Sequence, residues 1–261
     1  MLDVASGGVP GPRAFKNPEA ADGKPVNSHS LTFLTWNLAM LERSDQAPAS
    51  WTHEHAQAAI REFALGVAPD MILFQELPGL VPFMETHGMV RANPVTHSGN
   101  LATLLAHRLM DPIPAHLTIE RTALLTVLPH LDLTVANVHL TPGRAGSEDR
   151  LKQMERVVEA AETPHLLVVG DTNSRLSEEA DFNRLGLYGE KPPAPTWNSR
   201  RNRFHSEMPE FSAYFTRCFA TSQVVVDNLC VWDEARVEHD GSRFQLSDHY
   251  ALSGTLTLGA A

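Results

Sequence analysis

The chain has 261 residues, of which 43% are hydrophobic, so it is large enough to bury a proper core in one large or two small domains. Its net charge of −10 at pH 7 argues against binding nucleic acid with the whole surface, and its two cysteines exclude a disulfide framework. Every apolar run is shorter than a membrane span and the N-terminus lacks a secretion signal, so we expect a cytoplasmic protein with no membrane span and no obligate protein partner.

The ordered part of the chain is expected to begin after a flexible arm. Residues 1–30 are rich in Gly, Pro, Ala and Asn and show no hydrophobic period, which is typical of a flexible segment. No repeat or linker divides the rest, so one catalytic domain is predicted over residues 31–261. The elements predicted in its first half are a strand over 31–36, a helix between Ser50 and Pro69, a strand over 71–74, and strands over 101–106, 122–128 and 131–140.

The second half continues with alternating strands and helices. The two strands on either side of Pro129-His130 are predicted to pair as an antiparallel hairpin. An amphipathic helix is predicted from Ser147, with acidic residues in its first turn, where the helix dipole favours negative charge. The remaining predictions are a buried strand from His165, an irregular stretch over 189–195, a strand over 224–231 and a last strand over 250–258.

Polar residues follow several of these strands. Asp171 and Asn173 lie on the same side of an extended backbone, so a carboxylate and an amide could hold a water and an anionic oxygen together. A simple turn is the alternative, because Gly, Asp and Asn are ordinary turn residues. Asn37, Glu76 and His139 stand at the ends of other strands, and Asp248 and His249 stand at the start of the last one. Carboxylates gathered at one sheet edge need a cation between them, and an oxygen-rich site suits Mg²⁺ or Mn²⁺.

Five motifs, in order, resemble the endonuclease/exonuclease/phosphatase superfamily, the DNase I-like proteins. They are Thr35-Trp36-Asn37, Gln75-Glu76, Asn137-Val138-His139-Leu140, Gly170-Asp171-Thr172-Asn173 and Ser247-Asp248-His249. The resemblance covers about residues 31–258 and implies an α/β (α+β) fold, a four-layer αββα sandwich of two mixed β-sheets flanked by helices. The wording of the motifs, with the stretch from His139 through Arg150 to Gln153, is most similar to the 5′-tyrosyl-DNA phosphodiesterases.

The resemblance implies a divalent-metal-dependent phosphoesterase. Glu76 is the expected principal ligand of Mg²⁺ or Mn²⁺, with Asn37 and Asp248 near it. Asp171 is expected to orient and deprotonate the attacking water, while Asn173 holds that water or a phosphate oxygen.

Two histidines are expected to assist. His139 and His249 would donate to phosphate oxygens, and Asp227 or Asp248 would hold the ring of His249. Where the family has Asp followed by Arg, His or Tyr and then Ile, this chain has Asp227-Asn228-Leu229. A hydrogen-bonded core residue is the alternative interpretation of both His139 and Asp227.

Substrate contacts are expected from the only concentrated basic and aromatic patch. Trp197 and Phe204 could stack on a base while nearby arginines neutralise phosphates; packed loop aromatics are the alternative. These arginines are Arg200, Arg201 and Arg203. We therefore expect hydrolysis of a phosphodiester in nucleic acid, by a nuclease or a 5′-end-processing phosphodiesterase. The alternatives are a phospholipid, inositol phosphate or other small-molecule substrate and, in another class, a catalytically silent binding module.

Overall fold

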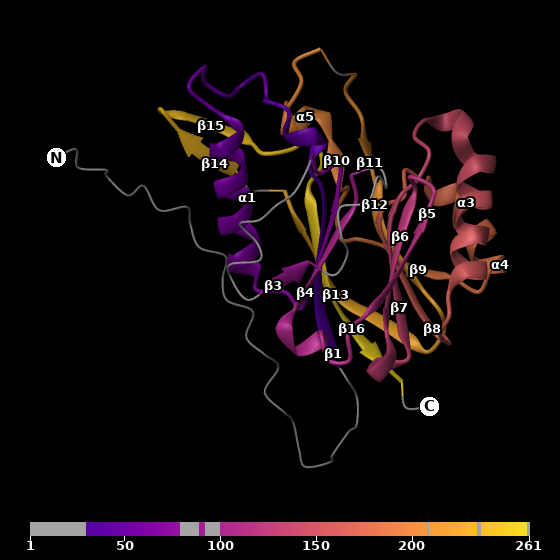
Figure 1. Cartoon of the computed structure of the whole chain (residues 1–261). Helices are drawn as coiled ribbons and strands as arrows, with labels where there is room; N and C mark the ends of the chain where they lie inside the picture. Colours follow the sequence, from indigo (N-terminus) through magenta and orange to yellow (C-terminus); the bar gives the residue numbers. More distant parts are fainter. Residues whose placement is uncertain (1–29, 79–88, 92–99, 208, 234–235, 260–261) are drawn as a thin grey trace, which may run out of the picture.

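The computed structural model describes residues 30–78, 89–91, 100–207, 209–233 and 236–259, so nearly all of the predicted N-terminal arm lies outside the described residues. In the described part, two six-stranded sheets stand face to face (Figure 1). The first sheet has, in spatial order, β13 (Val224–Trp232), β16 (Ala251–Leu258), β1 (Ser30–Asn37), β2 (Met71–Gln75), β4 (Ala102–Ala106) and β3 (Met89–Arg91). The second has β5 (Ala115–Ile119), β6 (Ala123–Leu128), β7 (Leu133–His139), β8 (His165–Asp171), β12 (Thr216–Ala220) and β9 (Tyr188–Glu190).

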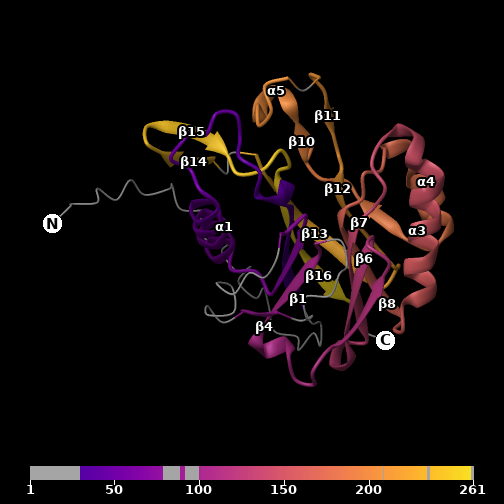
Figure 2. The same ribbon diagram turned by 45° about the horizontal axis from the view of Figure 1, so that its top comes forward.

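Helices cover the outer faces of this pair of sheets. They are α1 (His53–Val67), α3 (Ser147–Ala160) and α4 (Glu179–Arg184), whereas the short α5 (Ser199–Asn202) lies at the top of the view in Figure 1. Side chains from α1 pack on the first sheet, and those of α3 and α4 pack on the second (Figures 1 and 2). The four-layer αββα sandwich of mixed sheets is therefore confirmed. No helix of the described ranges is long and apolar enough to cross a bilayer.

Strand alternation aims the strand-end residues at the space between the sheets. Leu167 and Val169 of β8 lie in the core that joins the two sheets, and Asp171 is the next residue on that face. The same alternation carries β1 to Asn37 and β7 to His139. Because β1 runs parallel to β2, and β7 parallel to β8, the carboxyl ends of all four strands lie at one edge of the sandwich.

A buried amide pair joins the sheets just behind this edge. Gln75 Nε2 of β2 donates to Asn137 Oδ1 of β7 at 2.7 Å, and Asn137 Nδ2 donates in turn to the carbonyl oxygens of Phe74 and Ala102, both at 3.0 Å. Both side chains are fully buried. These bonds pair both amide nitrogens and Asn137 Oδ1, so they fix one sheet against the other where the site begins. Gln75 Oε1 has no hydrogen-bond partner among the described residues.

Several elements differ from the sequence predictions. α1, predicted between Ser50 and Pro69, begins at His53 with Thr52 as its cap and ends at Val67. β12 is a central strand, antiparallel to β8, that the sequence did not predict. Two short ribbons were not predicted either, namely β10 (Trp197–Asn198) with β11 (Ser212–Ala213), and β14 (Arg236–His239) with β15 (Ser242–Gln245). The 122–140 hairpin is confirmed as β6 and β7.

Candidate active site

Asp171 lies at the centre of the strand-end cluster and is 1% exposed. Its Oδ1 accepts a hydrogen bond from the backbone N–H of Asn173 at 3.1 Å, and its Oδ2 accepts one from Asn37 Nδ2 at 2.9 Å. Bonds at both oxygens hold the carboxylate in one orientation. The bond between Asn37 and Asp171 also joins the last residue of β1 to the last residue of β8, across the two sheets.

Glu76 shares a donor with Asp171. Asn37 Nδ2 also donates to Glu76 Oε1 at 3.0 Å, so one amide group lies between two carboxylates. Glu76 directly follows β2 and has a φ of 50°, a left-handed conformation that is uncommon outside glycine and often marks functional positions. Its side chain is 31% exposed, which leaves it open to solvent or ligand.

Both predicted histidines point at the same carboxylate oxygen. His139 Nε2 lies 3.6 Å from Asp171 Oδ2 and 3.6 Å from Glu76 Oε1, while His249 Nε2 lies 3.7 Å from Asp171 Oδ2. These separations exceed a direct hydrogen bond, so the contacts are electrostatic and depend on protonation of the rings. The structure thus brings Asn37, Glu76, His139, Asp171 and His249 into one cluster.

Asn173 is held beside this cluster in a turn. Its φ is 50°, its side chain is buried, and its Nδ2 donates to the carbonyl oxygen of Leu140 at 3.0 Å. The amide oxygen of Asn173 is then the group available to accept from a water. Asn173 is therefore a turn residue, as in the alternative interpretation, and the same turn places its side chain beside the cluster.

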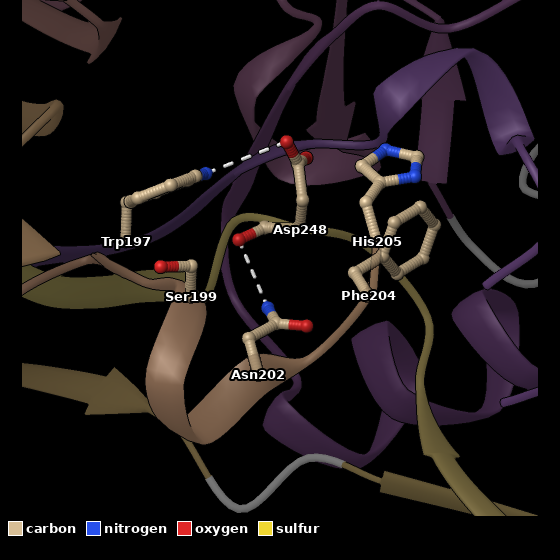
Figure 3. Close-up of a pocket in the computed structure, with 6 residues that line it drawn as sticks. All are labelled: Trp197, Ser199, Asn202, Phe204, His205 and Asp248. Atoms are coloured by element: carbon tan, nitrogen blue, oxygen red, sulfur yellow. Dashed lines mark hydrogen bonds between the residues drawn. The ribbon is translucent and has the colours of Figure 1, made fainter. Parts of the chain in front are cut away.

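Asp248 faces away from the two carboxylates. Its Oδ2 accepts from Trp197 Nε1 at 3.4 Å and its Oδ1 lies 3.4 Å from Ser247 Oγ. Figure 3 shows this carboxylate in a shallow hollow lined by Trp197, Ser199, Asn202, Phe204, His205 and Asp248. No three His, Cys, Asp or Glu side chains are grouped for a metal in the described ranges. The metal role of Asp248 stays a prediction.

The prediction that Asp227 holds the ring of His249 is wrong. Asp227 pairs with Thr255 in the ladder between β13 and β16, and Thr255 lies six residues beyond His249, which is roughly 20 Å along an extended strand. Its side chain is exposed and accepts from Asn228 Nδ2. Among the described residues, His249 Nδ1 has no hydrogen-bond partner, so Asp248 does not hold the ring either.

Backbone contacts place His249 instead. Its N–H donates to Ser247 Oγ at 3.1 Å, and its carbonyl oxygen accepts from Trp36 Nε1 at 3.0 Å. Ser247 Oγ donates to the carbonyl oxygen of Asn37 at 2.7 Å, which ties the histidine segment to the end of β1. The sequence prediction missed Ser247 as a positioning group, although the residue stands inside the Ser-Asp-His motif.

The aromatic residues of the predicted substrate patch are packed. Trp197 is 4% and Phe204 2% exposed, so neither presents a free ring face, and the packed-aromatic alternative is confirmed for both. Phe211 lies against Trp197 with ring centroids 4.3 Å apart and is 43% exposed. Nothing in the sequence distinguishes Phe211 from a core residue.

The arginines of this patch are exposed. Arg200 pairs with Glu210 at 2.9 Å and Arg201 pairs with Asp233 at 2.7 Å, whereas Arg203 ends α5 with a φ of 51°. Exposed pairs of this kind contribute little free energy, so a phosphate could replace the carboxylate partners.

A further arginine lies closer to the cluster. The guanidinium carbon of Arg175 is 4.6 Å from the ring centroid of Phe215, and that ring is 6.1 Å from the ring of His249. Burial lowers the pKa of Arg175, and the neighbouring positive charges of Arg150 and Arg144 lower it further. The signal for this residue was its place four positions after Asp171.

The donor set fits a hard divalent cation. Glu76 and Asp171 supply carboxylate oxygens, and their two charges concentrate negative potential at the cluster. Asn37 turns its amide nitrogen toward both carboxylates, while its amide oxygen accepts from Ala39 N at 2.9 Å. Mg²⁺ keeps several waters and usually takes only one or two protein carboxylates, so the cation does not need a cage of three acidic side chains.

Solved structures of phosphoesterase-like fold are similar to this chain over most of its length. The chain is similar to an endonuclease/exonuclease/phosphatase family protein from Bacteroides thetaiotaomicron, with a TM-score of 0.63 and 15% identity over 90% of this chain and 100% of the other. More particularly, it is similar to D. rerio TDP2 complexed with single-strand DNA product, with a TM-score of 0.65 and 18% identity over 87% and 98% of the two chains. It is also similar to beta toxin from Staphylococcus aureus, with a TM-score of 0.64 and 15% identity over 86% of this chain and 99% of the other.

These similarities establish the fold. The sequence itself matches no protein-family description and no curated protein. The superfamily resemblance carried by the five motifs is therefore confirmed at the level of architecture, by structures that share 15 to 18% of their residues with this chain.

Proposed function

We propose that the protein is a divalent-metal-dependent phosphoesterase that hydrolyses a phosphodiester in nucleic acid. One observation carries the proposal: five separate segments meet at the Asp171 carboxylate. Asn37, His139 and His249 lie beside it, and Glu76 joins them through Asn37 and His139. A buried carboxylate with two nearby imidazoles and a second carboxylate is typical of hydrolytic chemistry.

Glu76 would hold the cation, and Asn37 would join it by turning its amide oxygen from Ala39 N toward the carboxylates. A bound Mg²⁺ or Mn²⁺ would polarise a phosphoryl oxygen and stabilise the departing oxygen. Asp171 orients the attacking water and accepts its proton, and Asn173 holds the same water through its amide oxygen. Since an aspartate is a weak base with a reference pKa of about 3.9, the fixed orientation of its carboxylate must contribute much of the rate.

His139 and His249 would act on the phosphate. Both Nε2 atoms lie within 3.7 Å of Asp171 Oδ2. A protonated ring in this place can donate to phosphate oxygens as negative charge develops. Asp248 has a supporting role in this proposal: it accepts a hydrogen bond from Trp197 beside the site and would reach the cation directly or through a water.

Nucleic acid is the substrate class that we favour. The similar D. rerio TDP2 structure contains single-strand DNA product. In this chain, the exposed Phe211 ring offers a stacking surface beside Trp197, while Arg200, Arg201 and Arg203 place positive charge nearby on an otherwise acidic protein.

A substrate panel tests this proposal. The purified chain is assayed with Mg²⁺ or Mn²⁺ on single-stranded and duplex oligonucleotides, 5′-phosphotyrosyl DNA, inositol phosphates, phospholipid headgroup esters and simple phosphomonoesters. Cleavage of the oligonucleotides or the 5′-blocked DNA supports the proposal. Cleavage confined to the small molecules and lipids overturns the nucleic-acid assignment, and no cleavage of any ester favours a silent binding module.

A further inference from the structure

A buried arginine lies behind the cluster, on the side of the helical layer. Arg150 of α3 is 0% exposed, which is unusual for an arginine. Its Nε and Nη2 donate to the two carboxylate oxygens of Glu178 at 2.8 and 2.7 Å, a bidentate pair. Its Nη1 donates to the carbonyl oxygens of Thr141 and Gly143, both at 2.8 Å.

These bonds join the two loops that carry site residues. Thr141 and Gly143 belong to the loop after His139, at the end of β7. Glu178 belongs to the loop after Asp171, and its Oε1 also accepts from the backbone N–H of Arg175 at 3.1 Å. The guanidinium of Arg150 is therefore a bridge between both loops.

Strand pairing does not extend to the parts of the two loops that Arg150 joins. The ladder between β7 and β8 ends where His139 pairs with Asp171, followed by one bond from Leu140 N to Asp171 O at 2.9 Å. Asn173 lies beyond that point, in a left-handed conformation. In the described structure, its side chain makes one hydrogen bond to the opposite loop, to the carbonyl oxygen of Leu140. Its position relative to His139 consequently depends on how the two loops are held together.

The start of α3 is shaped around the same contact. Gln153, one turn after Arg150, accepts from Thr141 N at 3.0 Å and donates to Thr141 Oγ1 at 2.8 Å. A Cβ added at Gly146 would lie 2.9 Å from Arg150 Nη1 and 2.8 Å from Thr141 Cγ2. The missing side chain at Gly146 therefore leaves the room that the bridge requires.

We propose that Arg150 is a positioning residue for the hydrolysis: through Glu178 on one loop and Thr141 and Gly143 on the other, it sets the place of Asn173 relative to His139. Stability alone does not explain the pair, because well-packed apolar residues often replace a buried ion pair without loss. The proposal rests on the proposed function, since the rate of phosphoester cleavage is its main readout.

The test removes the bridge without leaving a buried charge. In the double variant Arg150→Met with Glu178→Met, we expect a folded protein with a melting temperature close to that of the parent but a kcat lower by about 100-fold and a KM changed far less, as for a catalytic group misplaced by about 1 Å. Arg150→Lys keeps the charge, but an ammonium group cannot make the bidentate pair with Glu178 and also reach both carbonyl oxygens, so its kcat should fall as well. Arg156→Lys is the matched control, because Arg156 is exposed on the same helix and pairs with Glu120.

A second measurement keeps this inference separate from the proposed function. Hydrogen exchange should be faster at residues 140–143 and 172–178 in the double variant and in Gly146→Ala than in the parent, with the rest of the chain unchanged. If the parent cleaves no phosphoester, the proposed function fails, and exchange alone then decides whether the bridge orders the loops. The parent kcat in a folded double variant, or identical exchange in the two loops, overturns the positioning role.

Discussion

Asp171 is the residue at which the hydrogen bonds and both histidines converge. The substitution Asp171→Asn keeps its size but places an amide group against the donors of Asn173 or Asn37 and removes the proton acceptor. We expect kcat to fall by at least about 100-fold, the lower range for loss of a positioned base, with an unchanged circular dichroism spectrum. Single-turnover cleavage of the preferred substrate measures the effect.

Asp227 supplies the control for this experiment. Its carboxylate is exposed and distant from His249 along β16, so Asp227→Asn should leave kcat within about twofold, as surface substitutions usually do. A parent-like rate in Asp171→Asn would remove Asp171 from the mechanism. A large loss in Asp227→Asn would contradict the placement of β13 against β16.

Cys218 gives the fold a pH dependence that is separate from catalysis. Burial between the sheets raises the pKa of its thiol to about 12, against about 8.5 in an unfolded chain. The folded state thus favours the protonated thiol, and this stabilisation is full below about pH 8.5 and is lost as pH rises toward 12. Between pH 8 and 10 the parent should lose about 2 kcal/mol more unfolding free energy than Cys218→Ala, measured by urea denaturation. Equal losses would show that the thiol is not buried.

At the scale of elements, β8 approaches β7 more closely next to Asp171 than a side chain allows. Gly170 has a φ of 143°, and a Cβ there would lie 2.3 Å from the carbonyl oxygen of Val138. We expect Gly170→Ala to lower the unfolding free energy by about 3 kcal/mol, because backbone must move to relieve the contact. Gly186→Ala is the control, since Gly186 also has a positive φ, 77°, but open space around it, and should cost about 1 kcal/mol. Equal costs at the two positions would refute the close approach.

At the scale of the whole molecule, the candidate cation site joins the two sheets. Glu76 follows β2 of the first sheet and Asp171 ends β8 of the second, so a cation held there binds only the assembled sandwich. Mg²⁺ or Mn²⁺ at ten times its Kd should therefore raise the unfolding free energy by about 1.4 kcal/mol, measured as a shift in Tm, and EDTA should reverse the shift and abolish cleavage. Glu76→Gln should abolish the shift. Identical titrations of parent and variant would exclude Glu76 as a ligand.

The sequence by itself predicted the architecture and most of the cluster. The architecture followed from the resemblance carried by the five motifs. Strand hydrophobicity is a local property, and the residue at the end of each apolar run is visible in the sequence, so Asn37, Glu76, His139 and Asp171 could be named before the fold was known. His249 was named from the Ser-Asp-His motif before the last strand. Alternation along each strand then determined which of these side chains faces the second sheet.

Only the tertiary structure decided the contacts that depend on register and burial. The pairing of Asp227 with Thr255 placed that carboxylate away from His249. Trp197 packs against Phe211, and both Trp197 and Phe204 are buried, so neither ring can stack on a base. The resemblance included Arg150, but only the structure shows that its side chain is buried and bonds to both loops. Register, burial and the meeting of distant loops arise from long-range packing, for which no single stretch of sequence carries the information.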